Sequence, residues 1–171
     1  MKRLLLIAFL FASGCATTYT CIPNHPKEYD LKGAIYDLAT ANGILPDSIQ
    51  YCVIDTEDIY AVVYGRLIKT SAFFLDSLTE EFLYCTVAHE LAHIILGHMP
   101  EDESPKIELE ADLLAIKVLE KYGMDGAKEK YKKMLWWLHV YHLDKYIKET
   151  ATHPSLYTRL ANLKKSLPQT P

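Results

Sequence analysis

The first apolar positions with a regular period lie between residues 27 and 41. They recur every three or four residues, at Leu31, Ala34, Ile35, Leu38 and Ala39. This spacing places them on one face of an amphipathic helix. The Asn42-Gly43 pair that follows is typical of a helix end. The pattern therefore predicts a helix over Lys27 to Ala41.

Three short runs rich in Val, Ile and Tyr follow this helix. They are Ile49–Ile54, Ile59–Tyr64 and Leu67–Thr70. β-Branched and aromatic residues in runs of this length favour strands. Gly65-Arg66, between the last two runs, has the length of a tight hairpin turn. The three runs therefore predict a small antiparallel sheet.

The remainder of the chain predicts helices. A long one is expected from about Thr79 to Gly97, where Ser77 and Glu80 form a capping-box pattern. Three more are expected from their start and stop signals: Pro105 to Gly123 after Ser104, about Gly126 to Lys148, and Ser155 to Leu167. The expected fold is α+β, with the sheet packed on the long helix and further helices after it.

Length and charge narrow the class of protein. A chain of 171 residues, half of them hydrophobic, fits a single globular domain, which we place at residues 27–171. The formal net charge of -4 gives no electrostatic reason to expect a nucleic-acid partner. The oligomeric state is left open by the sequence.

The N-terminal segment is expected to be a targeting signal. Two basic residues precede an apolar run, Leu4 to Ala12, that is too short to span a bilayer. The end of residues 1–14, followed by Cys15, resembles a bacterial lipobox, in which the cysteine is lipidated. We predict a lipoprotein signal peptide, with residues 15–26 as a tether. The alternative is an ordinary secretory signal that contains a cysteine.

Export places the mature chain in an oxidising compartment. By resemblance to lipoproteins of Gram-negative bacteria, Ala16 after the cysteine indicates the periplasmic face of the outer membrane, with the lipid as the only membrane contact. The alternative is a soluble secreted or periplasmic protein. Cys21, Cys52 and Cys85 allow one disulfide at most, and the sequence does not select the pair. Cys85 is interpreted as a small buried residue.

The stretch HELAH, His89 to His93, has the pattern of a zinc site. Two histidines four residues apart on a helix lie on one face, so both can bind one ion. Glu90 is rotated by about 100° from His89 and reaches the same side without entering the ligand set. This is the zinc-peptidase arrangement of two ligands and a carboxylate base.

The third ligand is predicted to be Glu108 on the next helix. Glu108 and Asp112 are again four residues apart, so one can complete a His-His-Glu site while Asp112 accepts a hydrogen bond from a ligand histidine. The alternative for both acids is a solvated helix face. His98, nine residues after His89, is expected on the opposite face of the helix, and Glu110 in solvent.

Three blocks of the chain resemble metallopeptidase family 48, the gluzincin group of the CAAX prenyl endopeptidase. They are LTEEFLYCTVAHELAHIILGH, ELEADLLAIKVLEKYGMD and THPSLYTRLANLKKSL. The resemblance covers about Ile49 to Leu167, and the blocks occur in the family's order. It implies a zincin-like fold and one zinc ion held by His89, His93 and Glu108. Tyr60-Ala61 departs from the Asn-Ala pair that many members carry before the active helix.

The resemblance also assigns expectations to the third block. His153 is expected near the metal, either as a donor to the oxyanion or as a fourth ligand that keeps the enzyme latent; the alternative is a simple break between helices. Arg159 is expected in a buried ion pair or in contact with substrate. Outside the blocks, the spacing of His139 and His142, three residues apart, allows a second ion, but packing or exposure is expected for both.

The predicted activity is zinc-dependent endopeptidase cleavage, with Glu90 activating a zinc-bound water. The substrate is expected to lie extended along the Ile59–Tyr64 edge of the sheet, and the resemblance points to extended or misfolded cell-envelope proteins. Two alternatives belong to other classes. One is a non-catalytic zinc-binding lipoprotein with a chaperone or scaffold role. The other is a cytoplasmic peptidase that cleaves phage-type repressors, which the signal sequence disfavours.

Overall fold

The structure is a computed structural model. It describes residues 20–57, 61–99, 104–141 and 153–166. The predicted signal peptide, the lipidation site Cys15, Tyr60 and His142 lie outside these residues.

The sheet has three strands, and its topology differs from the prediction. Its strands are β1 (Gln50–Ile54), β2 (Ala61–Tyr64) and β3 (Leu67–Ser71), in the order β1-β3-β2. The β2–β3 hairpin is antiparallel as expected, but β1 pairs with β3 in parallel. The predicted antiparallel sheet was therefore wrong, and the sheet is mixed.

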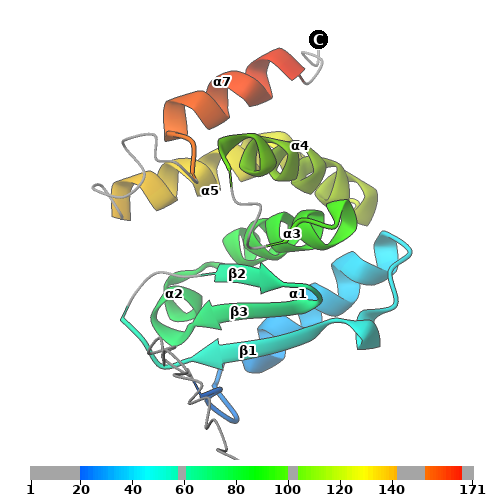
Figure 1. Ribbon diagram of the computed structural model, residues 1–171, viewed down its shortest axis with the longest axis vertical. Helices are drawn as coiled ribbons and strands as arrows, with labels where there is room; N and C mark the ends of the chain where they lie inside the picture. Colours follow the sequence, from blue (N-terminus) through cyan, green and yellow to red (C-terminus); the bar gives the residue numbers. More distant parts are fainter. Residues whose placement is uncertain (1–19, 58–60, 100–103, 142–152, 167–171) are drawn as a thin grey trace, which may run out of the picture.

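The reason lies in the connection between β1 and β2. Six residues separate Ile54 from Ala61, enough to cross the roughly 10 Å between strands that are two places apart. β3 can therefore take the central position, and β2 becomes an edge of the sheet. This edge is the one next to helix α3 (Glu80–Leu96) (Figure 1).

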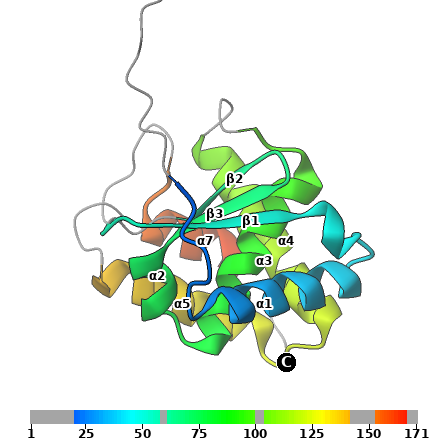
Figure 2. The same ribbon diagram turned by 90° about the horizontal axis from the view of Figure 1, so that it is seen from below.

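The α+β class is confirmed, with six α-helices in the described part of the chain. Besides α3 they are α1 (Glu28–Ala41), α2 (Ala72–Ser77), α4 (Pro105–Tyr122), α5 (Ala127–Tyr141) and α7 (Leu156–Ser166). A 3-10 turn, η1 (Pro46–Ser48), precedes β1. α3 lies between the sheet and the layer that holds α4 and α5, with α7 beyond them (Figure 1). In Figure 2, which views the molecule from below, α1 runs alongside the sheet.

The start of α3 differs from the predicted capping box. Thr79, and not Ser77, caps α3 by accepting a hydrogen bond from the Phe82 amide at 3.3 Å. Ser77 ends the short helix α2, which the sequence analysis missed and which Ser71 caps by accepting from the Phe74 amide. A helix of six residues is too short to show a periodic pattern.

Small buried residues bring α3 and α4 together. Ala88 and Ala92 on α3, and Ala111 and Ala115 on α4, are all fully buried. Alanines at such positions let two helix axes approach closely, and the two helices pack directly on each other. The residues next to these alanines therefore meet across the interface. None of the helices in the described ranges combines the length and apolar composition required to cross a membrane.

The described part of the expected tether is fastened to β1. Cys21 forms a disulfide with Cys52, and the Ile22 amide donates to the Val53 carbonyl at 2.7 Å. Cys85 is a free thiol with no exposed surface, as predicted.

Candidate metal centre

Three residues from two helices bring metal-binding atoms together. His89 and His93 on α3 face Glu108 on α4, and their ligand atoms all lie within 4.8 Å of one another. The two Nε2 atoms are 3.1 Å apart. Nε2 of His89 lies 3.3 Å from Oε2 of Glu108, and Nε2 of His93 lies 3.4 Å from its Oε1. Among the described residues this is the one such group of three or more.

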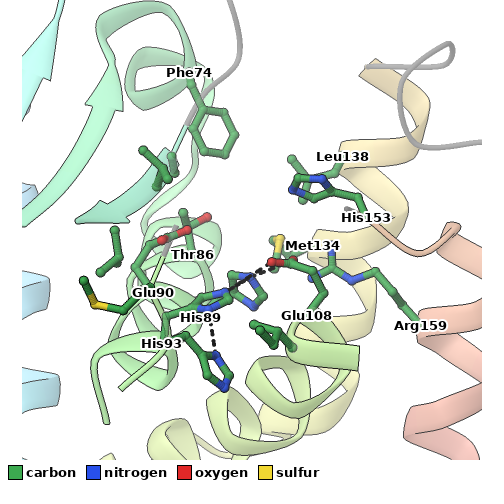
Figure 3. Close-up of a pocket in the computed structure, with 16 residues that line it drawn as sticks. Phe74, Thr86, His89, Glu90, His93, Glu108, Met134, Leu138, His153 and Arg159 are labelled. Atoms are coloured by element: carbon green, nitrogen blue, oxygen red, sulfur yellow. Dashed lines mark hydrogen bonds and ion pairs between the residues drawn. The ribbon is translucent and has the colours of Figure 1, made fainter. Parts of the chain in front are cut away.

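Glu90 shares a pocket with this group. It is 5 % exposed and lines the pocket beside the two histidines, while Glu108 faces them from the opposite helix (Figure 3). Burial raises the pKa of its carboxyl group. Part of the pocket wall is apolar: Val63, Phe74, Ile107, Met134 and Leu138.

The electrostatics of the group favour a cation among the ligand atoms. Burial lowers the pKa of His89, but hydrogen bonds with the carboxylates of Asp112 and Glu108 outweigh it and raise that pKa to about 10. Burial likewise raises the pKa of Glu108, yet hydrogen bonds with His89 and His93 hold it well below its usual range. Positive charge at this point therefore lowers the electrostatic energy of the site.

The outer nitrogen of His89 has two partners. Its Nδ1 lies 3.3 Å from Oδ1 of Asp112, the residue that the sequence analysis expected there. The hydroxyl of Tyr131 on α5 lies nearer, at 2.9 Å, and donates to the same Asp112 oxygen at 2.7 Å. No pattern in the sequence predicted Tyr131 as a partner of His89. The feature that identifies Tyr131 is its burial in the structure, because a fully buried tyrosine needs a partner for its hydroxyl.

Arg159 on α7 completes this side of the site. Its Nε donates to Oδ2 of Asp112 at 2.8 Å, and its Nη2 donates to Oδ1. Asp112 is fully buried and Arg159 is 6 % exposed. Of the two expectations for Arg159, the structure places it in the buried ion pair, and its side chain also lines the pocket.

The outer nitrogen of His93 has a different partner, and here the prediction was wrong. His98 does not point away: its Nδ1 lies 3.1 Å from Nδ1 of His93, and its Nε2 lies 3.6 Å from Oε2 of Glu110. The helix ends at Leu96, and Gly97 adopts a left-handed conformation with φ 69°. The chain therefore folds back, and counting helical turns beyond Gly97 misplaces His98. Glu110 is partly exposed, and it is also paired.

The remaining histidines take separate positions. His153 lines the same pocket, on the far side beside Leu138 (Figure 3), but it is outside the group of three. Pro154 follows it, and α7 begins at Leu156. His139 packs edge-on against Trp136, with ring centroids 5.7 Å apart, and does not line this pocket.

Comparison with known families is consistent with this site. The family model described as Peptidase U49 matches residues 77–170, which is 94 of the 171 residues. The matched region contains α3, α4, α5 and α7, and so every residue named above as a ligand or its partner. No curated protein matches the chain. The family match confirms the expected peptidase class without assigning the chain to family 48.

Proposed function

The chain belongs to the peptidase family U49, and we propose that it is a zinc-dependent endopeptidase of the zincin type. The observation that carries the proposal is the convergence of His89, His93 and Glu108, with the buried carboxyl group of Glu90 in the same pocket. The resemblance of the same blocks to metallopeptidase family 48 supports the zinc-dependent form of the activity.

The donor set fits one zinc ion. Two imidazole nitrogens and one carboxylate oxygen are the ligands of several catalytic zinc sites, which keep a fourth position open. Lone pairs of three such groups repel one another unless a cation lies among them. When bound, zinc supplies a Lewis acid that polarises a carbonyl oxygen and lowers the pKa of water towards neutrality.

Glu90 then acts as the general base. A carboxyl group whose pKa is raised by burial is better matched to proton transfer near neutral pH. Glu90 takes a proton from the attacking water and passes it to the nitrogen of the leaving amine. The peptide C–N bond breaks, and the products are a carboxylate and an amine.

His153 is suited to one of two roles. From its side of the pocket it can donate a hydrogen bond to the negative charge that develops on the carbonyl oxygen. Alternatively it can turn towards the three ligands and close the site, which gives a latent enzyme. Asp112 and Arg159 act through the ligand His89, which the carboxylate of Asp112 helps to orient.

The substrate is proposed to be an extended polypeptide. β2 is an edge strand, and its residues Ala61, Val62 and Val63 line the pocket. A peptide laid along this edge can pair with the outward backbone groups of Ala61 to Val63 and pass Glu90. Misfolded proteins of the cell envelope present such segments.

We also propose that the protein is an exported lipoprotein of the bacterial outer membrane, lipidated at Cys15. The Cys21–Cys52 disulfide supports export, since disulfides persist in oxidising compartments. The alternative is a soluble secreted or periplasmic protein.

The test compares casein cleavage by the full chain, in mild detergent, with that by Glu90→Gln and Glu80→Gln. Glu80 is an exposed residue of the same helix and serves as the matched control. Zinc content is measured for all three. We expect one zinc per chain in each, and a loss of at least about 100-fold in rate for Glu90→Gln alone.

The outcomes separate the parts of the proposal. If none of the three proteins cleaves although all hold zinc, the site is latent or non-catalytic. Cleavage by His153→Ala then indicates a latent enzyme, and no cleavage by it replaces the peptidase with a non-catalytic zinc-binding protein. If the wild type cleaves and holds no zinc, the peptidase activity stands and its dependence on zinc is wrong. Equal rates for wild type and Glu90→Gln would remove Glu90 as the base.

A further inference from the structure

A histidine can bind zinc through Nε2 only when that nitrogen has a free lone pair, so the hydrogen must sit on Nδ1. We propose that Tyr131 is the positioning residue that fixes this state of His89. The inference rests on the proposed zinc site, and it concerns a residue on a third helix that is neither a ligand nor in the pocket wall.

The geometry around the hydroxyl of Tyr131 defines its role. It lies between Nδ1 of His89, at 2.9 Å, and Oδ1 of Asp112, at 2.7 Å. The direct contact of Asp112 with the same Nδ1 is longer, at 3.3 Å. The hydroxyl is therefore the nearest hydrogen-bonding partner of His89 on the side away from the ligand cluster.

The direction of each hydrogen bond follows from the charges. Asp112 pairs with Arg159 and is a carboxylate, which only accepts hydrogen bonds. The single hydroxyl hydrogen of Tyr131 is donated to it. The hydroxyl oxygen then presents lone pairs to His89, so Nδ1 must carry the hydrogen and donate. In the neutral ring that binds a metal, Nε2 is then the nitrogen with the lone pair, and it faces Glu108 and His93.

Packing alone does not require this hydroxyl. Tyr131 is fully buried on α5, and Met134 and Leu135 of the same helix are buried with it. A phenylalanine would fill the same space without a polar atom to satisfy. The hydroxyl instead joins side chains of α3 and α4 through two hydrogen bonds. It therefore fixes the orientation of the His89 ring relative to Asp112.

The chain offers a matched control for the removal of one hydroxyl. Tyr84 donates to Oδ2 of Asp37 at 2.7 Å, the same distance and the same chemistry. That pair joins α3 to α1 and does not touch the ligand residues. Tyr131→Phe and Tyr84→Phe thus each delete one tyrosine–aspartate hydrogen bond, and Tyr131→Phe alone also deletes the contact with His89.

The experiment measures zinc affinity of the full-length protein by competition with a chromophoric chelator. Thermal unfolding of the metal-free proteins is measured alongside. We expect Tyr131→Phe to bind zinc about 10–100-fold more weakly than the wild type. Tyr84→Phe is expected to bind zinc like the wild type. Both variants are expected to stay folded without metal, with the larger fall in Tm for Tyr131→Phe, because its partner Asp112 is fully buried whereas the Tyr84–Asp37 pair is part-buried.

Cobalt(II) in place of zinc adds a spectroscopic readout. The visible absorption of the cobalt-loaded protein reports the ligand field, so a reoriented His89 shifts the bands of Tyr131→Phe and leaves those of Tyr84→Phe in place. Zinc affinity and cobalt spectra that match the wild type in Tyr131→Phe would overturn the inference. A wild type that binds no zinc would overturn the proposed function itself, and the inference with it.

A measurement on the unmodified sequence covers the case in which Tyr131→Phe does not fold. In the zinc-loaded wild type, ¹⁵N NMR of the histidine rings is expected to show His89 with its hydrogen on Nδ1. Because that hydrogen is hydrogen-bonded beside a buried tyrosine, its exchange with water is expected to be slow. A hydrogen on Nε2, or exchange as fast as in an exposed histidine, would contradict the role of Tyr131.

Discussion

The two histidines proposed as ligands are equally buried, with 12 % and 13 % of their side chains exposed, yet their outer nitrogens are held in different ways. His89 is held from the interior, by Tyr131 and the Asp112–Arg159 ion pair. His93 is held by His98, whose own partner is the exposed residue Glu110.

The two histidines differ in how far water reaches the carboxylate that supports each of them. The carboxylate of Asp112 has no exposed surface, whereas the side chain of Glu110 is 44 % exposed. A buried charge that loses its partner has no water to replace it, but an exposed one does. The His89 side of the candidate metal centre is therefore supported by a charge inside the core, and the His93 side by a charge that water can reach.

The largest effect on unfolding free energy is expected for Asp112→Ala, which tests the buried support of His89. It leaves the guanidinium of Arg159 buried without its partner, and we expect the metal-free protein to lose about 3–5 kcal/mol of unfolding free energy. Glu110→Ala is the control on the same helix, with an expected loss below about 1 kcal/mol. Denaturant unfolding measures both. Similar losses for the two variants would show that burial does not distinguish the two sides.

Removal of the Cys21–Cys52 disulfide separates the stability of the fold from the positioning of the proposed ligands. The Cys21–Cys52 disulfide closes a loop of 31 residues, so its removal is expected to cost about 3–4 kcal/mol of unfolding free energy by the chain-entropy model. The double variant Cys21→Ala/Cys52→Ala changes no residue of the metal centre. Its zinc affinity, measured on the folded protein, should equal that of the wild type. A weakened affinity would mean that the sheet positions the ligands.

The smallest expected effect is that of His98→Ala. Water that enters beside the exposed Glu110 can replace His98 as the partner of Nδ1 of His93. Zinc affinity should therefore fall by about tenfold or less. That is less than for Tyr131→Phe. His139→Ala, a histidine outside the pocket, is the matched control and should leave the affinity unchanged. A larger loss for His98→Ala than for Tyr131→Phe would reverse the ranking of the two sides.

Local patterns in the sequence predicted what depends on neighbours along the chain. The helix over residues 28–41 and the hairpin after β2 follow from period and turn length. The meeting of His89, His93 and Glu108 follows from two helices that each present residues four apart on one face. The helix and the hairpin are each fixed by the geometry of one element, and the three-residue group needs in addition that α3 and α4 pack against each other.

The errors arose where an element ends or where packing decides. His98 was misplaced because a helical count was continued past Gly97, although glycine at that place is typical of a left-handed helix cap. The parallel pairing of β1 depends on which strand takes the central place, which no local pattern encodes. Tyr131 reaches His89 only through the packing of α5 on α3 and α4, so its partner cannot be read from the spacing of residues in the sequence.

The ion pair between Asp112 and Arg159 has a consequence for the order of events during synthesis. The two residues are 47 positions apart, and the three ligands all precede Asp112 in the chain. A ribosome therefore releases the whole set of metal-binding groups well before the cation that neutralises Asp112 exists. Until α7 is made and docked, the carboxylate of Asp112 lacks its counter-charge, and the interior side of the centre remains incomplete. Maturation of the proposed centre is thus tied to completion of the polypeptide through α7, because a chain interrupted before Arg159 carries the proposed ligands and leaves Asp112 without its counter-charge.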